Sequence, residues 1–232
     1  MASQNRYKQF YTLGGKFIDS SEWTPEMSLD YLHHHYGWEA VMAYGNLIHD
    51  DLSAYGPGVQ SGDVYVDLGS NIGMSALSAE RRNASKIYCI EPDYDCYEAL
   101  ARNRGSNWIL DNVAIADKPG TIQVAKWPNS NDLRPVTAIT FDQYVNQHCL
   151  DRIDYLKIDI EGHEKTVIHS ISDNTWNKIR KMFIEYHEDN TLTESQKHVE
   201  RLKFMSVLLE KGFTEHCLLV RHYQSFFYAW KM

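Results

Sequence analysis

The stretch DVYVDLGSNIG, residues 63–73, decides the fold of this chain. Its first half, residues 63–68, is a short apolar run with β-branched residues, which predicts a buried strand. Residues 69–73 break that run, and residues 74–82 begin a helix. The two glycines allow a tight turn, a close approach of the backbone to a ligand, and a helix that starts close to the turn. A strand, a glycine turn and a helix in this order present free N–H groups to a ligand.

The alternation of strands and helices continues along the chain. Further strands are predicted at residues 86–90, 108–116, 121–127, 154–160 and 181–187, and helices at residues 94–103, 164–170 and 193–211. The chain closes with strands at 213–220 and 224–231, which a short polar turn joins into an antiparallel hairpin. We therefore expect an α/β, Rossmann-like domain at residues 61–232. It would have a mostly parallel seven-stranded sheet, a C-terminal antiparallel hairpin and helices on both faces.

The first 60 residues differ from the rest. Turn residues at 20–25 and 55–58 enclose two predicted short helices at 27–36 and 38–49, so residues 1–60 are interpreted as an N-terminal helical extension or cap. The start of the chain has no apolar signal-peptide core, and no apolar run approaches the roughly 20 residues of a membrane span. These features favour a cytoplasmic protein that acts without a membrane.

The overall balance of charge is acidic, with a formal net charge of −8 in 232 residues. That balance argues against a non-specific nucleic-acid binder, and a homo-oligomer is compatible with it. The four cysteines form no CxxC pair, so we expect reduced thiols and neither a disulfide framework nor a zinc site.

A ligand in an open α/β sheet binds beyond the carboxyl ends of the strands. The first candidates for binding it are the loop residues Asp67, Gly69, Ser70, Asn71 and Gly73, where Asp67 either bonds the ligand or holds the loop. The loop is not GxGxxG, because Asn71 replaces the glycine that admits a pyrophosphate, and this weakens a dinucleotide reading. A turn that only reverses the chain is the alternative.

Glu91 ends the second strand about 20 residues beyond the loop, where an acidic residue can accept both ribose hydroxyls of a nucleoside. Pro92 then ends the strand. Asn112, Val113 and Ala114 lie at the end of the third strand, and complete the candidate nucleoside-binding set. A solvent-facing carboxylate at a strand end is the alternative for Glu91.

Two further acidic motifs lie at the ends of later strands, LKIDIEGHE at 156–164 and FIEYHED at 183–189. Asp159 and Glu161 lie two apart, so within a strand they would share a face and could point together at the site. His187 is a candidate general base because its ordinary pKa is near neutrality. We take these three residues as the catalytic candidates; a helix-capping cluster and a hydrogen-bonded histidine are the alternatives.

A metal centre is not expected. Asp159, Glu161 and Glu185 could hold Mg²⁺ or Ca²⁺, so a divalent metal is possible but not favoured. The three consecutive histidines at 33–35 point in different directions on a helix and cannot easily bind one ion.

Together these motifs resemble the FkbM family of methyltransferases, whose pattern reads D-x-G-A-N-x-G, then E-P, then K-x-D-[VI]-E-G-x-E. The chain matches it at residues 67–73, 91–92 and 157–164. Residues 112–117 with Gly120 look like the family's third-strand segment, and residues 137–144 are similar to its pre-strand helix start. The resemblance covers roughly residues 62–190. Ser70 stands where alanine is usual, and residues 1–60 match no such pattern.

The resemblance implies a class I methyltransferase that uses S-adenosylmethionine, with O-methylation of a hydroxyl on a sugar or small metabolite. The loop backbone would meet the methionyl part, Glu91 the ribose, and residues 112–114 the adenine. Asp159, also counted among the cofactor-binding candidates, and Glu161 would face the methyl group or the acceptor. Asp159 or His187 would take the hydroxyl proton. The alternatives are a nicotinamide-dependent oxidoreductase and a non-catalytic nucleoside-binding protein on the same fold.

Overall fold

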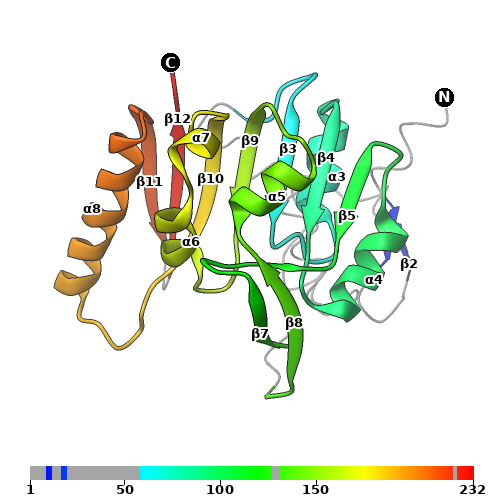
Figure 1. Ribbon diagram of the computed structural model, residues 1–232, viewed down its shortest axis with the longest axis horizontal. Helices are drawn as coiled ribbons and strands as arrows, with labels where there is room; N and C mark the ends of the chain where they lie inside the picture. The colour runs from blue at the N-terminus through cyan, green and yellow to red at the C-terminus, as the bar shows by residue number, and fades with distance from the viewer. Residues whose placement is uncertain (1–8, 12–16, 20–57, 127–130, 222–223) are drawn as a thin grey trace.

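The computed structural model describes residues 9–11, 17–19, 58–126, 131–221 and 224–232. A seven-stranded sheet forms its centre, in the order β11-β12-β10-β9-β3-β4-β5 (Figure 1). These strands are β3 (Val64–Leu68), β4 (Lys86–Ile90), β5 (Trp108–Asp111), β9 (Ile153–Ile158), β10 (Ile179–His187), β11 (Glu215–Arg221) and β12 (Gln224–Trp230). β12 pairs antiparallel with both β10 and β11, and the other pairs are parallel. The predicted sheet and its C-terminal hairpin are confirmed; the turn residues 222–223 lie outside the described residues.

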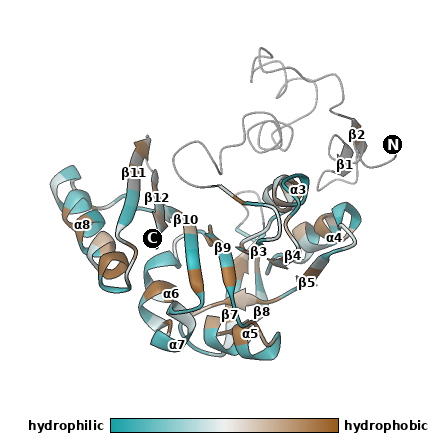
Figure 2. Ribbon diagram, turned by 90° about the horizontal axis from the view of Figure 1, so that it is seen from above, coloured by the Kyte–Doolittle hydropathy of each residue, from teal (hydrophilic) through white to brown (hydrophobic). Residues whose placement is uncertain are grey.

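Helices cover both faces of this sheet, as predicted (Figure 2). Side chains of β3 alternate between the faces: Tyr65 packs with α3 and α4, whereas Val66 and Leu68 pack with the helices on the other face. The helices are α3 (Met74–Arg81), α4 (Tyr94–Asn103), α5 (Phe141–Gln147), α6 (Glu164–Ser170), α7 (Asp173–Trp176) and α8 (Glu194–Glu210). The short helix α7 was not predicted. The arrangement is the Rossmann-like α/β fold that the sequence predicts.

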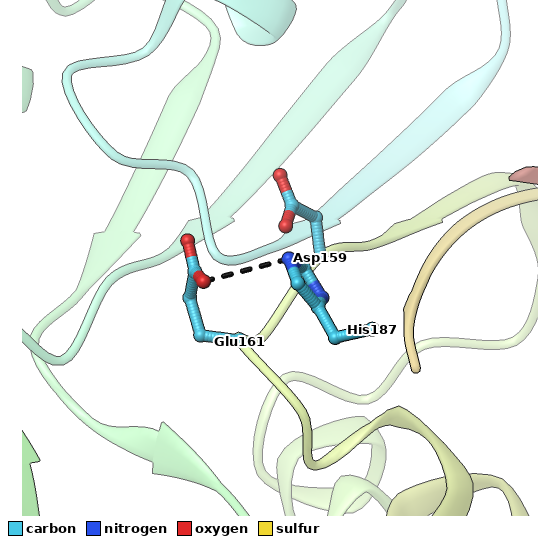
Figure 3. A group of neighbouring side chains, drawn as sticks. All are labelled: Asp159, Glu161 and His187. Atoms are coloured by element: carbon cyan, nitrogen blue, oxygen red, sulfur yellow. Dashed lines mark ion pairs between the residues drawn. The ribbon is translucent and has the colours of Figure 1, made fainter. Parts of the chain in front are cut away.

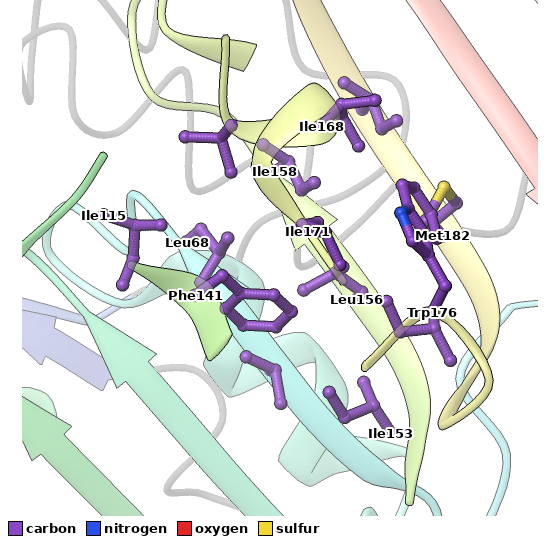
Figure 4. Close-up of a cluster of buried hydrophobic side chains, with 14 of the residues drawn as sticks. Leu68, Ile115, Phe141, Ile153, Leu156, Ile158, Ile168, Ile171, Trp176 and Met182 are labelled. Carbon is purple, nitrogen blue, oxygen red and sulfur yellow. The ribbon is translucent and has the colours of Figure 1, made fainter. Parts of the chain in front are cut away.

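The larger core lies on the second face, between the central strands and helices α5 to α8 (Figure 4). Leu156 on β9, Phe141 on α5 and Trp176 on α7 are almost completely buried in it. Each such side chain stabilises the fold by about 1.5–3 kcal/mol. This rigid centre fixes the carboxyl ends of β3, β9 and β10, where the polar motifs lie.

A second, three-stranded sheet was not predicted. It has the order β6-β8-β7, with β6 (Ala114–Ile115), β7 (Gly120–Ala125) and β8 (Leu133–Ile139). The predicted strand at 108–116 is therefore two strands in different sheets. The likeness of residues 137–144 to a helix start is wrong for residues 137–139, which belong to β8; Pro135 within the run disguised that strand. The helix begins after Thr140, whose side chain forms a capping box with Gln143.

The second sheet is attached beside the carboxyl ends of the main strands (Figure 1). Lys126 and Arg134 at the β7–β8 hairpin both pair with Asp95 at the start of α4, at 2.8 and 3.4 Å. These pairs lower the pKa of Asp95, chiefly through the hydrogen bond from Lys126. The hairpin thus borders the edge of the sheet where a ligand is expected.

In the N-terminal region, β1 (Gln9–Tyr11) pairs antiparallel with β2 (Phe17–Asp19), and β1 lies against α4. This pair was not predicted, and the predicted helices at 27–36 and 38–49 lie outside the described residues. Of the cysteines whose side chains are described, all three are free thiols, as expected: Cys89, Cys96 and Cys149. None of the helices in the described ranges combines the length and apolar character that a membrane span requires.

Candidate active site

The glycine loop between β3 and α3 is held against the loop that follows β9. Gly69 has a φ of +81°, and a Cβ placed on it would lie 1.8 Å from the carbonyl oxygen of Asp159. Gly73 has a φ of +92°, and a Cβ there would lie 2.7 Å from Leu100. The two glycines are therefore required by close packing within the protein. The group that a Cβ on Gly69 would meet first is the backbone carbonyl of Asp159.

Backbone hydrogen bonds define the shape of this loop. The N–H groups of Gly69 and Ser70 both donate to the carbonyl of Ile90, each at 3.0 Å. The N–H of Gly73 donates to Ser70 at 2.8 Å, and the Ser70 hydroxyl donates to the carbonyl of Asp67 at 2.9 Å. Helix α3 begins without a side-chain cap. Its first N–H groups suit a carboxylate such as that of a methionyl group.

Asp67 supports the loop from within the protein. Its side chain is 0% exposed; it accepts a hydrogen bond from Ser75 and lies 3.2 Å from the ammonium of Lys157. Burial raises the pKa of Asp67, and Lys157 opposes that shift. Because Asp67 is completely buried, we assign it the role of holding the loop, which is one of the two roles expected for it.

Glu91 links the end of β4 to the same loop. Its two carboxylate oxygens accept hydrogen bonds from the N–H groups of Asn71 at 2.7 Å and Asp93 at 2.8 Å. The residue is 7% exposed, and burial raises its pKa to about 8. A carboxylate oxygen has two lone pairs, so each still has room for a ligand hydroxyl.

The three candidates at the end of β5 differ in exposure. Asn112 is exposed, and its side-chain amide donates to the carbonyls of Glu91 and Pro92 at 2.8 and 3.1 Å. Val113 is half-buried, whereas Ala114 is buried in the second sheet beside Ala138. Asn112 therefore fastens the ends of β4 and β5 together, next to Glu91.

The three catalytic candidates lie together at the carboxyl ends of β9 and β10 (Figure 3). Asp159, Glu161 and His187 each offer one ligand atom, and these atoms lie within 4.8 Å of one another. Glu161 and Glu185 approach Nε2 of His187 at 3.4 and 3.9 Å. The strand ends at Ile158 and Glu161 has a φ of +54°, so a turn, and not a shared strand face, turns Glu161 toward His187.

A buried carboxylate fixes the ring of His187. Nδ1 of His187 lies 3.0 Å from the carboxylate of Glu164, which is 1% exposed. This carboxylate also accepts hydrogen bonds from the N–H groups of Ile160 and Gly162. Burial alone would lower the pKa of His187, but the hydrogen bond and charge of Glu164 raise it to about 9. At neutral pH the imidazole therefore carries a proton on each nitrogen and is a cation.

Three further residues belong to this cluster and were not among the catalytic candidates. Glu185 has a pKa raised to about 7 by burial and by the charge of Asp159. Glu164 was expected only at a helix start, since its partner His187 is distant in sequence. Lys157 lies within a strand whose six residues are all buried. A lysine in such an apolar run was the signal that could have identified it.

The cluster has the ligand types of a divalent-cation site, two carboxylates and an imidazole. The structure places His187 where the sequence had suggested Glu185 as the third ligand. The three histidines at 33–35 lie outside the described residues.

Comparison with known proteins agrees with this geometry. Residues 67–215 match the model of the methyltransferase FkbM domain. Methyltransferase sdnD of Sordaria araneosa is 24% identical over 64% of this chain and 72% of its own length. The 31-O-demethyl-FK506 methyltransferase FkbM of Streptomyces tacrolimicus is 22% identical over 60% and 72%.

One similar solved structure is fibrillarin of Aeropyrum pernix with bound S-adenosyl-L-methionine, which is 14% identical and has a TM-score of 0.47. The match covers 75% of this chain and 69% of the fibrillarin chain. TrmK of M. capricolum, with S-adenosyl-homocysteine, is 11% identical, covers 75% and 64%, and has a TM-score of 0.47. The family model spans more than half of the chain and includes the glycine loop, Glu91 and the acidic cluster. The chain is therefore a member of the FkbM family of S-adenosylmethionine-dependent methyltransferases.

Proposed function

We propose that this enzyme transfers the methyl group of S-adenosylmethionine to a hydroxyl oxygen of a sugar or another small metabolite. The observation that carries the proposal is the acidic cluster of Asp159, Glu161 and Glu185 beyond the donor loop. Carboxylates accept hydrogen bonds, so they suit a hydroxylated acceptor and can take its proton. The name of the Streptomyces relative refers to an O-demethyl compound, which supports oxygen as the acceptor atom.

The donor side fits the methyl donor. The uncapped start of α3 suits the methionyl carboxylate, and Glu91 and Asn112 border the place expected for the nucleoside. When bound, the donor supplies a methyl group on a positively charged sulfur, which leaves as a neutral thioether. The acceptor oxygen forms the new bond to carbon as the sulfur–carbon bond breaks. The protein aligns the three atoms, and such alignment can contribute about 7–11 kcal/mol to lowering the barrier.

The hydroxyl proton has to leave the acceptor. His187 is held as a cation by Glu164, with a pKa of about 9, so it does not readily accept a proton at neutral pH. Asp159 lies beside it at the end of β9 and is half-buried. We therefore assign the proton to Asp159, and to His187 the orientation of Glu161 and of the acceptor.

The test is incubation of the enzyme with radiolabelled donor and a metabolite extract, followed by separation of labelled small molecules from labelled polymers. We expect label in a small hydroxylated compound. Label only on protein or nucleic acid would overturn the acceptor class. Asp159→Asn should lose most of the labelling, whereas Asp173→Asn, which alters an exposed carboxylate on α7, should retain it.

Two alternatives predict different results. A nicotinamide-dependent oxidoreductase would bind NADH, which its fluorescence would report on mixing. A non-catalytic nucleoside-binding protein would bind S-adenosylmethionine in a calorimetric titration and transfer label to nothing. Membership of the FkbM family favours methyl transfer over both.

A further inference from the structure

Lys157 is a buried cation near the active site that the steps described above do not use. It is 8% exposed and lies in β9 among residues that are all buried. Burial of an unpaired ammonium group is very unfavourable, so a lysine at such a position requires partners. Its partners indicate what it does.

The ammonium of Lys157 contacts three acceptors from two neighbouring segments. Nζ lies 3.0 Å from the carbonyl oxygen of Gly69, 3.2 Å from Asp67 and 3.3 Å from Asp159. An ammonium has three N–H donors, and these three contacts match them. Burial alone would lower the pKa of Lys157, but attraction to Asp67 and Asp159 raises it, so the group stays charged.

The backbones on either side of this contact are held without Lys157. The N–H of Gly69 donates to Ile90, and the N–H of Asp159 donates to Leu68, each at 3.0 Å. The Asp159 carboxylate differs, because within the described residues its hydrogen-bond donor is Lys157. Removal of the ammonium would therefore release the Asp159 side chain more than the donor loop.

We propose that Lys157 is a positioning residue for methyl transfer, which fixes the Asp159 carboxylate relative to Gly69 of the donor loop. This inference rests on the proposed function, in which Asp159 faces the acceptor and takes its proton. One buried cation then sets the distance between the donor-binding backbone and the group that receives the proton.

The first test is the double variant Asp67→Asn/Lys157→Met, which removes the buried pair without leaving Asp67 as an unpaired charge. Asp67→Asn alone is the matched control. Calorimetry measures the dissociation constant for S-adenosylmethionine, and the initial rate of labelling at saturating donor measures turnover. We expect the rate to fall by about tenfold or more relative to the control, since small displacements at a reacting centre have large effects. The dissociation constant should change by less than about threefold. Equal changes in both quantities, or no loss of rate, would overturn the proposal.

A double-mutant cycle tests whether Lys157 acts through Asp159. In the background Asp67→Asn/Asp159→Asn, adding Lys157→Met should lower the remaining rate by less than about twofold. If the effects of the two substitutions multiply, Lys157 acts independently of Asp159 and the proposal fails.

A structural readout separates this inference from the proposed function. Crystals of the wild type and of Asp67→Asn/Lys157→Met, each grown with S-adenosylhomocysteine, would show the Asp159 side chain directly. The proposal requires that this side chain move in the variant while the Gly69 backbone stays in place. An unmoved Asp159 side chain contradicts the role of Lys157 whatever the acceptor is, and absent label with a moved side chain contradicts only the proposed function.

Discussion

The two halves of the site meet at Gly69 and Asp159 but are built in different ways. The donor half, from Asp67 to Gly73 with Glu91, is mostly buried and is fixed by hydrogen bonds of the backbone. The acceptor half, at the carboxyl ends of β9 and β10, is fixed by ion pairs between side chains, and the Glu161 side chain is 73% exposed. Backbone groups are present whatever the side chain, so the shape of the donor half depends mainly on its two glycines. The chemistry of the acceptor half depends instead on which side chains stand at its positions.

The largest expected effect comes from Gly69→Ala, because Gly69 lies where the two halves meet and its substitution disturbs both of them. The new methyl group would lie 1.8 Å from the Asp159 carbonyl oxygen, and φ at this position is +81°. The two loops have to separate, so we expect the free energy of unfolding to fall by about 3 kcal/mol and donor binding to become undetectable. Chemical denaturation and calorimetry measure these effects.

Gly62→Ala is the control, since Gly62 has a φ of +86° but no atom within 4 Å of a Cβ. It should lose only the conformational part, about 1 kcal/mol. If Gly69→Ala is no worse than this control, the two loops are not packed as described.

The next largest effect concerns the donor half alone. Glu91→Gln keeps the size of the side chain but replaces one acceptor oxygen with an amide NH2 group, which can only donate. Hydrogen bonds from a backbone N–H and from a ribose hydroxyl are then lost on that side, so we expect the affinity for S-adenosylmethionine to fall by about tenfold. Glu98→Gln, an exposed change on α4, serves as the control. Calorimetric titration measures both, and unchanged affinity in Glu91→Gln would remove Glu91 from the ribose role.

The same residue predicts a dependence on pH. Burial raises the pKa of Glu91 to about 8, and its ionised form is the better acceptor for two ribose hydroxyls. The affinity for the donor should therefore rise as pH passes through 8, and in Glu91→Gln only the titration of the donor's own amino group should remain.

The effect of the Glu91 titration on the stability of the fold has the opposite sign. The folded chain retains the Glu91 proton that the unfolded chain loses, so this contribution to stability falls as pH rises from 4.5 through 8.

A smaller effect concerns the acceptor half alone. Glu164→Gln removes the charge that fixes His187, so we expect a loss of stability of about 2 kcal/mol with donor affinity unchanged. In the wild type the raised pKa of His187 gives a contribution that is complete below 6.5 and is lost as pH rises through about 9. Melting temperatures across that range should therefore fall less steeply in the variant. Glu210→Gln, an exposed change at the end of α8, should follow the wild type.

The difference between the halves also explains what the sequence could predict. The donor loop, Glu91 and the seven-stranded sheet depend on local patterns, a glycine turn and alternating apolar residues, which remain visible in one dimension. The hydrogen bond between Glu164 and His187 joins residues on different elements, and no local sequence pattern indicates it. The second sheet was hidden because β6 has only two residues and β8 contains Pro135.

The smallest expected effect concerns metal ions. Asp159, Glu161 and His187 have suitable ligand atoms, yet the carboxylates already face two cations: Lys157 lies 3.3 Å from Asp159, and His187 lies 3.4 Å from Glu161. A metal ligand has to be deprotonated, so an ion would have to displace a proton from His187, whose pKa is raised to about 9.

We therefore expect a chelator such as EDTA to leave the rate of labelling unchanged, and Mn²⁺ to show no saturable binding at micromolar concentration by electron paramagnetic resonance. A loss of rate that Mn²⁺ or Mg²⁺ restores would contradict this expectation. It would also change the assignment of the proton, because a metal ion bound by Asp159 would itself acidify the acceptor hydroxyl. The acceptor half would then be organised by an ion, and its ion pairs would describe only the metal-free state.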